Sequence, residues 1–294
     1  MPLRLIALPP ERAALVRVLD GDGPWTIGRD PGCQVVLDHA SISRRHAELA
    51  SDGNGYLLRD LGSRNGVYVD GLRVDRVRIR GPAWCLLGDV FCELEAIAPD
   101  QLESALRRER ARRETSRALT GALDASAGEH ALLSQVMDSV VELVQAERGF
   151  LLLRGARGGL HVVATHGIAP DESSQPLFAG SAGAVERALR GRRPVISHDL
   201  RQDAALGARP SVVSAGLAAL VAVPLLEADR CIGAVYADST VAGKRFTELD
   251  LDLLQAFCER AGLMLAALDL RARLDRAGAA ALPGITRFPA AVDA

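Results

Sequence analysis

This sequence of 294 residues has almost no lysine and no excess of charge of either sign. Lys244 is the only lysine, so 34 of the 35 basic residues are arginine, and 37 residues are acidic. The resulting formal net charge of -2 creates no overall field that would draw the protein to nucleic acid or to an anionic membrane. A basic binding site in this chain must therefore be local.

Cysteine is scarce and widely scattered, at positions 33, 85, 92, 231 and 258. The chain has no C-x-x-C pair and no histidine near a cysteine at the spacing of zinc ligands. The pattern excludes a disulfide framework of the kind found in small secreted domains. The sequence predicts reduced thiols in hydrophobic cores, no bound metal and no cofactor.

Long hydrophobic runs and the signatures of nucleotide-using enzymes are also missing. No stretch approaches 18 apolar residues without a charge, and the N-terminus carries no leader with a small-residue cleavage site. The chain contains no G-x-x-x-x-G-K-[ST] loop and no protein-kinase signature. We therefore expect a cytoplasmic protein that is not an enzyme and has neither a membrane nor a nucleic acid as partner.

Changes in patterning divide the chain into four segments. Residues 1–98 contain short apolar runs separated by Gly, Asp, Asn and Pro, which predicts an all-β sandwich. Residues 99–128 form a charged, helix-favouring stretch, predicted to be a solvent-exposed helical linker, with a dimeric coil as the alternative. Residues 129–275 alternate helical and strand patterns, which predicts an α+β domain around an antiparallel sheet. The Ala- and Pro-rich residues 276–294 are predicted to be a disordered tail.

Three short motifs lie at predicted turns of the first domain. They are Gly28-Arg29, Ser43-Arg44-Arg45-His46 and the segment Asp60-Leu61-Gly62-Ser63-Arg64-Asn65-Gly66. Each has a local explanation: the first can end a strand, His46 can be a core histidine, and Asn-Gly favours a hairpin turn. Together they supply guanidinium, hydroxyl and carboxamide donors, which is the set that holds a phosphate dianion.

These motifs resemble the FHA (forkhead-associated) family, whose pattern runs G-R, then S-R-x-H, then D-L-G-S-x-N-G. The resemblance covers residues 3–97 and implies a β-sandwich that binds phosphothreonine peptides through its apical loops. It implies phosphopeptide binding by Arg29, Ser43, Arg44, Arg64 and Asn65, and structural support of that site by Gly28, His46 and Gly66. The implied partner is a phosphothreonine-containing protein, such as a Ser/Thr protein kinase or its substrate.

Within this resemblance the individual roles differ. Arg29 is expected to clamp the phosphate, with Ser43 and Arg44 adding hydroxyl and guanidinium contacts. Asn65 is expected to hold the peptide backbone beside the phosphothreonine. Arg64 stands where the family often has Ser or Thr. Its guanidinium is therefore expected either to form an ionic contact with the ligand or to point into solvent.

The second domain resembles the GAF family, in residues 146–153, 223–225 and 233–238 and in the closing helix introduced by Phe246. The resemblance implies a small-molecule sensor or a dimerisation module, with an unknown ligand if there is one. Phe246 and Asp250 match part of the cyclic-nucleotide signature, but the Asn-Lys pair that precedes it is absent. The closing helix has leucines on more than one face, from which we expect a homodimer.

Two functions follow from the resemblance. The first is a phosphothreonine-dependent signalling adaptor or sensor in a bacterial Ser/Thr kinase pathway. The alternative is a GAF ligand sensor, acting as a regulator in a transcriptional or kinase pathway, with a constitutive or intramolecular FHA contact. Thr115, Thr120 and Thr286 are the candidate internal phosphothreonines for such a contact.

Overall fold

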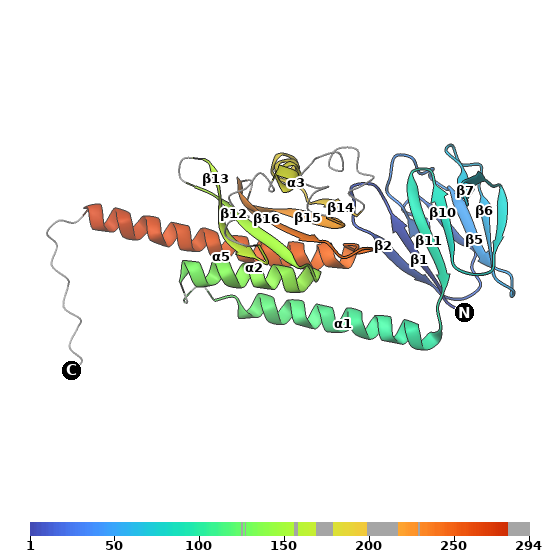
Figure 1. Ribbon diagram of the computed structural model, residues 1–294, viewed down its shortest axis with the longest axis horizontal. Helices are drawn as coiled ribbons and strands as arrows, with labels where there is room; N and C mark the ends of the chain where they lie inside the picture. The colour runs from blue at the N-terminus through green and yellow to red at the C-terminus, as the bar shows by residue number, and fades with distance from the viewer. Residues whose placement is uncertain are drawn as a thin grey trace.

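The computed structural model of the protein describes residues 1–124, 126, 128–155, 158–168, 179–198, 217–228 and 230–281. Two domains follow one another along the chain, with helix α1 (Pro99–Ala122) running from the first along the second (Figure 1). Among the described helices, none combines the length and the apolar character needed to cross a membrane. Four of the five cysteines are buried, and Cys231 is partly exposed.

Two sheets packed face to face form the first domain and confirm the predicted sandwich (Figure 1). One sheet has the order β2 (Leu15–Leu19), β1 (Leu3–Leu8), β11 (Val90–Ala96), β10 (Ala83–Leu87), β7 (Val67–Val69), β8 (Leu72–Arg73). The other has the order β4 (Val35–Val36), β3 (Trp25–Gly28), β5 (Ala47–Ser51), β6 (Tyr56–Asp60), β9 (Arg76–Ile79). Neighbouring strands are antiparallel except the pair β3 and β4.

Alternation of apolar residues sets the register of these strands. In β1, Leu3, Leu5 and Ala7 are buried while the residues between them are partly exposed. Because side chains along a strand point to opposite faces in turn, a slip of one residue would expose all three. This pattern made the sandwich predictable from the sequence.

The second domain is built on an antiparallel sheet, which confirms the predicted α+β class. Its order is β13 (Leu160–His166), β12 (Arg148–Arg154), β16 (Arg230–Ser239), β15 (Ala219–Glu227), β14 (Val195–Ser197). Helices α2 (Glu129–Val144) and α5 (Glu248–Ala281) pack on one face, and α3 (Ala179–Gly191) lies on the other (Figure 1). Helix α5 continues into the segment 276–294 that was predicted as a tail, whereas residues 282–294 lie outside the described part of the chain.

Helix α1 is mostly solvent-exposed, as the linker was predicted to be, but the end of the helix also packs on the second domain. Leu119, in the last turn of α1, and Leu123, directly after the helix, pack against the core of the second domain. The Arg112 guanidinium donates to the Leu143 carbonyl at 2.6 Å and forms an ion pair with the Asp250 carboxylate. The charged character of this segment concealed the packing, because Arg112 is satisfied by partners far away in the sequence.

The loop between β1 and β2 joins the two domains through backbone hydrogen bonds. The Ala14 N–H donates to the Phe246 carbonyl at 2.9 Å, and the Glu248 N–H donates to the Ala14 carbonyl at 3.0 Å. Ala13 is buried among the core residues of the second domain. Beside this bridge, the Arg245 guanidinium pairs with both carboxylate oxygens of Glu93 on β11.

His198 completes the junction in its neutral form. Its Nε2–H donates to the Arg12 carbonyl at 2.8 Å, and its Nδ1 lies 3.4 Å from the Phe246 N–H, from which it accepts. Burial lowers the pKa of His198 to about 4, and nearby Arg245 acts in the same direction while Asp250 opposes it. A proton on Nδ1 would remove the acceptor for Phe246 and leave a cation at the junction.

Acidification is therefore expected to destabilise the protein through His198. The pKa of His198 in the folded state lies below its unfolded value of about 6.5. The neutral ring therefore makes its full contribution to the free energy of unfolding above pH 6.5, and this contribution is lost as the pH falls towards 4. Between pH 7 and pH 4.5, the free energy of unfolding measured in urea should fall by about 2 kcal/mol more in the wild type than in His198→Asn. His130→Asn, a change at an exposed histidine of α2, is the control, and parallel pH profiles for wild type and His198→Asn would contradict the assignment.

Candidate functional site

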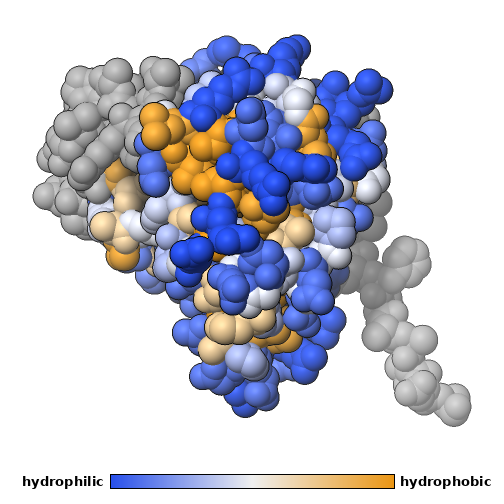
Figure 2. Space-filling model, turned by 90° about the vertical axis from the view of Figure 1, so that its right-hand side faces the viewer, coloured by the Kyte–Doolittle hydropathy of each residue, from blue (hydrophilic) through white to orange (hydrophobic). Residues whose placement is uncertain are grey.

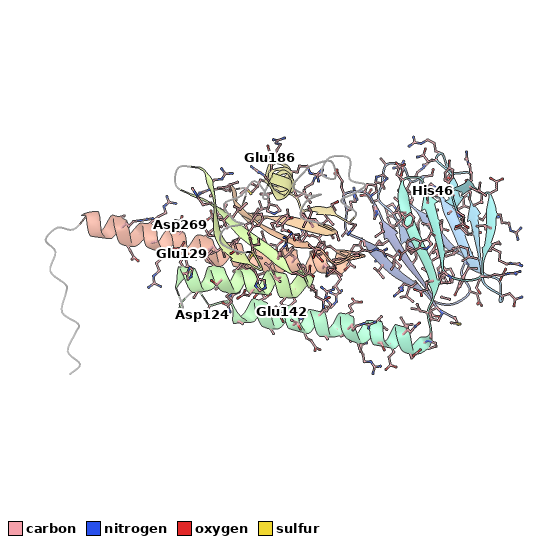
Figure 3. All side chains as sticks on the ribbon, viewed as in Figure 1. His46, Asp124, Glu129, Glu142, Glu186 and Asp269 are labelled. Carbon is pink, nitrogen blue, oxygen red and sulfur yellow. The ribbon has the colours of Figure 1, made fainter. Side chains whose placement is uncertain are left out.

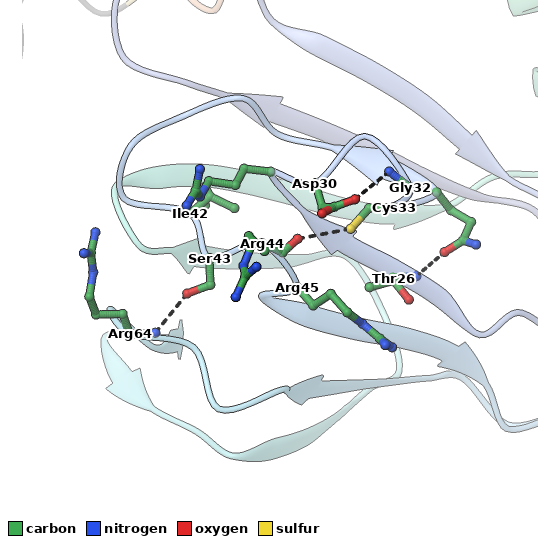
Figure 4. Close-up of a pocket in the computed structure, with 11 residues that line it drawn as sticks. Thr26, Asp30, Gly32, Cys33, Ile42, Ser43, Arg44, Arg45 and Arg64 are labelled. Atoms are coloured by element: carbon green, nitrogen blue, oxygen red, sulfur yellow. Dashed lines mark hydrogen bonds between the residues drawn. The ribbon is translucent and has the colours of Figure 1, made fainter.

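A basic pocket of about 810 Å³ lies at the loop end of the sandwich (Figure 4). Four arginines line it, Arg29, Arg44, Arg45 and Arg64, together with the Ser43 hydroxyl. Figure 2, which looks onto the end of the molecule formed by the first domain, shows hydrophilic side chains around an apolar patch. The arginines that line the pocket are all solvent-exposed and available to a ligand.

Backbone contacts hold the first two motif loops together. The Arg29 N–H donates to the Ser43 carbonyl at 3.0 Å, and the Asp30 N–H donates to the Arg44 carbonyl at 3.1 Å. Where these loops meet, a Cβ on Gly28 would lie 2.1 Å from the Arg44 carbonyl oxygen. Only glycine allows the two backbones to approach this closely, so the first glycine of the motif pattern shapes the pocket.

The Ser43 hydroxyl joins the third motif loop to the other two. Its Oγ accepts a hydrogen bond from the Arg64 N–H at 3.0 Å (Figure 4). Because the oxygen is engaged as an acceptor, the hydroxyl hydrogen remains available to donate to a ligand. The Arg64 guanidinium also donates to the Ala40 carbonyl at 3.2 Å, which keeps it at the rim.

His46 lies inside the first domain, fully buried behind these loops (Figure 3). Its Nδ1 accepts the Ser43 N–H at 3.1 Å, and its Nε2–H donates to the Gly66 carbonyl at 3.0 Å. Burial lowers the pKa of His46, so the ring is neutral and uses one nitrogen as acceptor and the other as donor. These contacts link the second motif loop to the third on the side of the loops that faces the core.

Asn65 differs from the other residues of the expected site. Its Nδ2 donates to the Ser41 carbonyl at 2.7 Å, within the domain, and its side chain does not line the pocket. The structure thus brings together Arg29, Ser43, Arg44 and Arg64 but leaves Asn65 outside the pocket wall.

Sequence reasoning missed three polar residues of the pocket, Arg45, Thr26 and Gln34. The family pattern treats the position of Arg45 as variable, so the motif did not single it out. Strand alternation offered no signal here, because Arg45 lies in the bend before β5 and both His46 and Ala47 are buried.

Positive charge in the pocket is largely uncompensated. Asp30 is the one carboxylate among the lining residues, and its Oδ1 accepts the Gly32 N–H at 2.9 Å. In the described part of the chain, none of the four lining arginines forms an ion pair. Within the same residues, no cluster of three His, Cys, Asp or Glu side chains could hold a metal ion. The pocket is suited to an anion.

Comparison with family models identifies both domains. Residues 25–81 match the FHA domain and residues 126–266 match the GAF domain. The chain contains an FHA domain followed by a GAF domain. Domains of these two families are typically non-catalytic signalling or binding modules.

Similar proteins match mainly one domain at a time. The glycogen accumulation regulator GarA of Mycolicibacterium smegmatis is 44% identical over 55 residues, covering 18% of this chain and 35% of that protein. The oxoglutarate dehydrogenase inhibitor of Corynebacterium jeikeium is 46% identical over 43 residues, covering 15% of this chain and 30% of that protein. The chain thus spans about a third of the length of these two relatives.

Solved structures resemble each domain separately. The FHA domain of the CT664 protein from Chlamydia trachomatis has 30% identity and a TM-score of 0.31, covering 33% of this chain and 100% of that chain. The GAF domain of an Acinetobacter phosphoenolpyruvate-protein phosphotransferase has 15% identity and a TM-score of 0.44, covering 59% of this chain and 97% of that chain.

Gly28→Ala is expected to destabilise the FHA domain because the added Cβ would overlap the Arg44 carbonyl oxygen. We expect a loss of about 2 kcal/mol in the free energy of unfolding, measured by denaturant titration. Gly81→Ala is the matched control, since a Cβ at Gly81 would meet nothing within 4 Å. Equal stability of the two variants would show that the loops can move apart without cost.

Proposed function

We propose that this protein is a non-enzymatic, cytoplasmic signalling adaptor that binds a phosphothreonine-containing protein through the FHA pocket. The observation that carries the proposal is the pocket itself. Arg29, Arg44 and Arg64 line it together with the Ser43 hydroxyl, which can still donate a hydrogen bond to a ligand. A Ser/Thr protein kinase or one of its substrates is the partner that this chemistry fits.

The donor geometry supports recognition of a phosphate dianion. A phosphothreonine carries about -1.5 to -2 charge at pH 7 and offers three strong acceptor oxygens. Arg29, Arg44 and the Ser43 hydroxyl supply charge-assisted hydrogen bonds to such oxygens, and Arg64 adds positive charge at the rim. Binding of this kind needs no nucleophile, general base or metal.

Phosphate selectivity is expected to depend on Arg29. Arg29→Ala should weaken binding of a phosphothreonine peptide by about thirtyfold or more, equivalent to about 2 kcal/mol, because the phosphate loses one of its cationic donors. The measurement is fluorescence anisotropy with a labelled degenerate phosphothreonine library and its unphosphorylated counterpart.

Arg59→Ala serves as the control for this experiment. Arg59 lies on β6, in the sheet that also contains β3. Its guanidinium pairs with Glu48 at 3.2 Å, outside the pocket. Equal binding of phosphorylated and unphosphorylated peptides by the wild type would exclude the proposed function.

An intramolecular FHA contact is less well supported by the structure. Thr115 and Thr120 lie in helix α1, which runs away from the FHA domain, and the helix would have to unwind to bring either residue to the pocket (Figure 1). Thr286 lies outside the described residues.

For the GAF domain, we propose dimerisation as the main role. Exposed leucines recur along one side of α5, where Leu263, Leu270 and Leu274 are 60%, 56% and 64% exposed. Their steps of seven and four residues are those of a coiled-coil seam. On the other sheet face, under α3, Phe150 and Tyr236 stack at 4.6 Å within an apolar cluster.

Substituting Leu263 and Leu270 together by Glu should convert a dimer into a monomer, since paired charges would face each other in the seam. Multi-angle light scattering measures the change in mass. Leu106→Glu, at an exposed leucine of α1, should leave the mass unchanged. A monomeric wild type at the highest attainable concentration would contradict dimerisation through α5.

A further inference from the structure

The pocket carries more positive charge than one phosphate requires. Four guanidinium groups line it against a single carboxylate, so a bound dianion would leave part of the charge uncompensated. Figure 4 shows Ser43, Arg44 and Arg64 at one end, whereas Arg45 points the other way, towards Thr26. The basic side chains therefore divide into two groups.

The burial of the residues that follow Arg45 explains why its side chain is separated from the other end of the pocket. The next residue, His46, is buried, and its N–H donates to the Ile27 carbonyl of β3 at 2.8 Å. Arg45 lies in the bend before β5 and is solvent-exposed, whereas His46 and Ala47 are both buried, so Arg45 lies on the outer side of the domain. Thr26 lies on the same side, because its neighbours Trp25 and Ile27 are buried.

The groups around Arg45 are mainly hydrogen-bond donors. The Gln34 Oε1 accepts the Thr26 N–H at 2.8 Å, which turns the carbonyl of this amide inward and leaves its NH₂ group as a donor. The Thr26 hydroxyl lines the same wall. A guanidinium, an amide NH₂ and a hydroxyl together form a site for an anionic group.

Two other arginines of this sheet are paired with carboxylates. Arg59 pairs with Glu48 at 3.2 Å, and Arg78 pairs with Asp52 at 2.6 Å. Among the described residues, Arg45 has no carboxylate partner. The positive charge of Arg45 is therefore available to an anionic group inside the pocket.

We propose that Arg45, Thr26 and Gln34 form a second anion subsite, which selects partners that carry an acidic side chain close to the phosphothreonine. The proposal rests on the proposed function, since the phosphothreonine positions the rest of the peptide. The shared chemistry is an anionic side chain, supplied either by an Asp or Glu carboxylate or by a second phosphorylated residue.

Peptides of one background sequence test the subsite with the full chain. One set has a phosphothreonine with neutral flanks, a second has a single Glu at each flanking position in turn, and a third has a second phosphothreonine at those positions. The wild type should bind at least one acidic peptide about fivefold more tightly than the neutral one, equivalent to about 1 kcal/mol. If the Glu peptides gain more affinity over the neutral peptide, the anion is a carboxylate. If the doubly phosphorylated peptides gain more, it is a second phosphorylated residue.

Arg45→Ala should remove this preference while leaving binding of the neutral phosphopeptide within about twofold of wild type. Arg59→Ala, with its paired guanidinium, should retain the preference. A preference that survives in Arg45→Ala, or a wild type that gains nothing from any acidic position, would overturn the subsite alone. Failure of every phosphopeptide to bind would overturn the subsite together with the proposed function.

Discussion

Where β3 ends, the backbone of Gly28 passes so close to the Arg44 carbonyl that no other residue fits there. Two backbone hydrogen bonds, from Arg29 to Ser43 and from Asp30 to Arg44, follow from this approach. His46 then holds the second loop against Gly66 of the third. The pocket is thus rigid at its base, while the side chains that would contact a ligand lie in solvent. Such preorganisation reduces the entropy lost on binding.

The junction between the domains is centred on the β1–β2 loop of the first domain, and ion pairs of Glu93 and Arg17 with Arg245 and Glu248 add to it. Residues 12–14 bind the GAF domain through backbone groups and His198, and the Arg12 side chain pairs with Asp38 at 2.7 Å. Asp38 precedes the loop that carries Ser43 and Arg44, so the junction and the pocket are neighbours in the fold. Both partners of this ion pair are more than half exposed, 52% and 78%, so the link contributes little energy. The backbone bridge is the stronger element of the junction.

Placement determines what the many arginines of this chain do. Arg112 and Arg245 are partly buried and paired with carboxylates, where they join α1 to α5 and one domain to the other. Arg29, Arg44 and Arg45 have no such partners in the described residues and converge on one pocket. A net charge near zero is compatible with this arrangement, because the 37 acidic residues of the chain balance its 35 basic ones overall while the excess at the pocket remains.

Local patterns determined the sandwich, the α+β class of the second domain and the loops of the basic pocket, because alternation, turn residues and motif spacing act over a few residues. Tertiary structure alone decided which motif residues line the pocket. The Asn65 amide is bonded to Ser41, 24 residues away, and Arg45 points to the outer face beside Thr26. It also decided the packing of α1, through an ion pair between Arg112 and Asp250, 138 residues apart, and the bridge of Ala14 to the GAF domain. Partners so distant in sequence leave no periodic signal, since they meet only when both domains are folded.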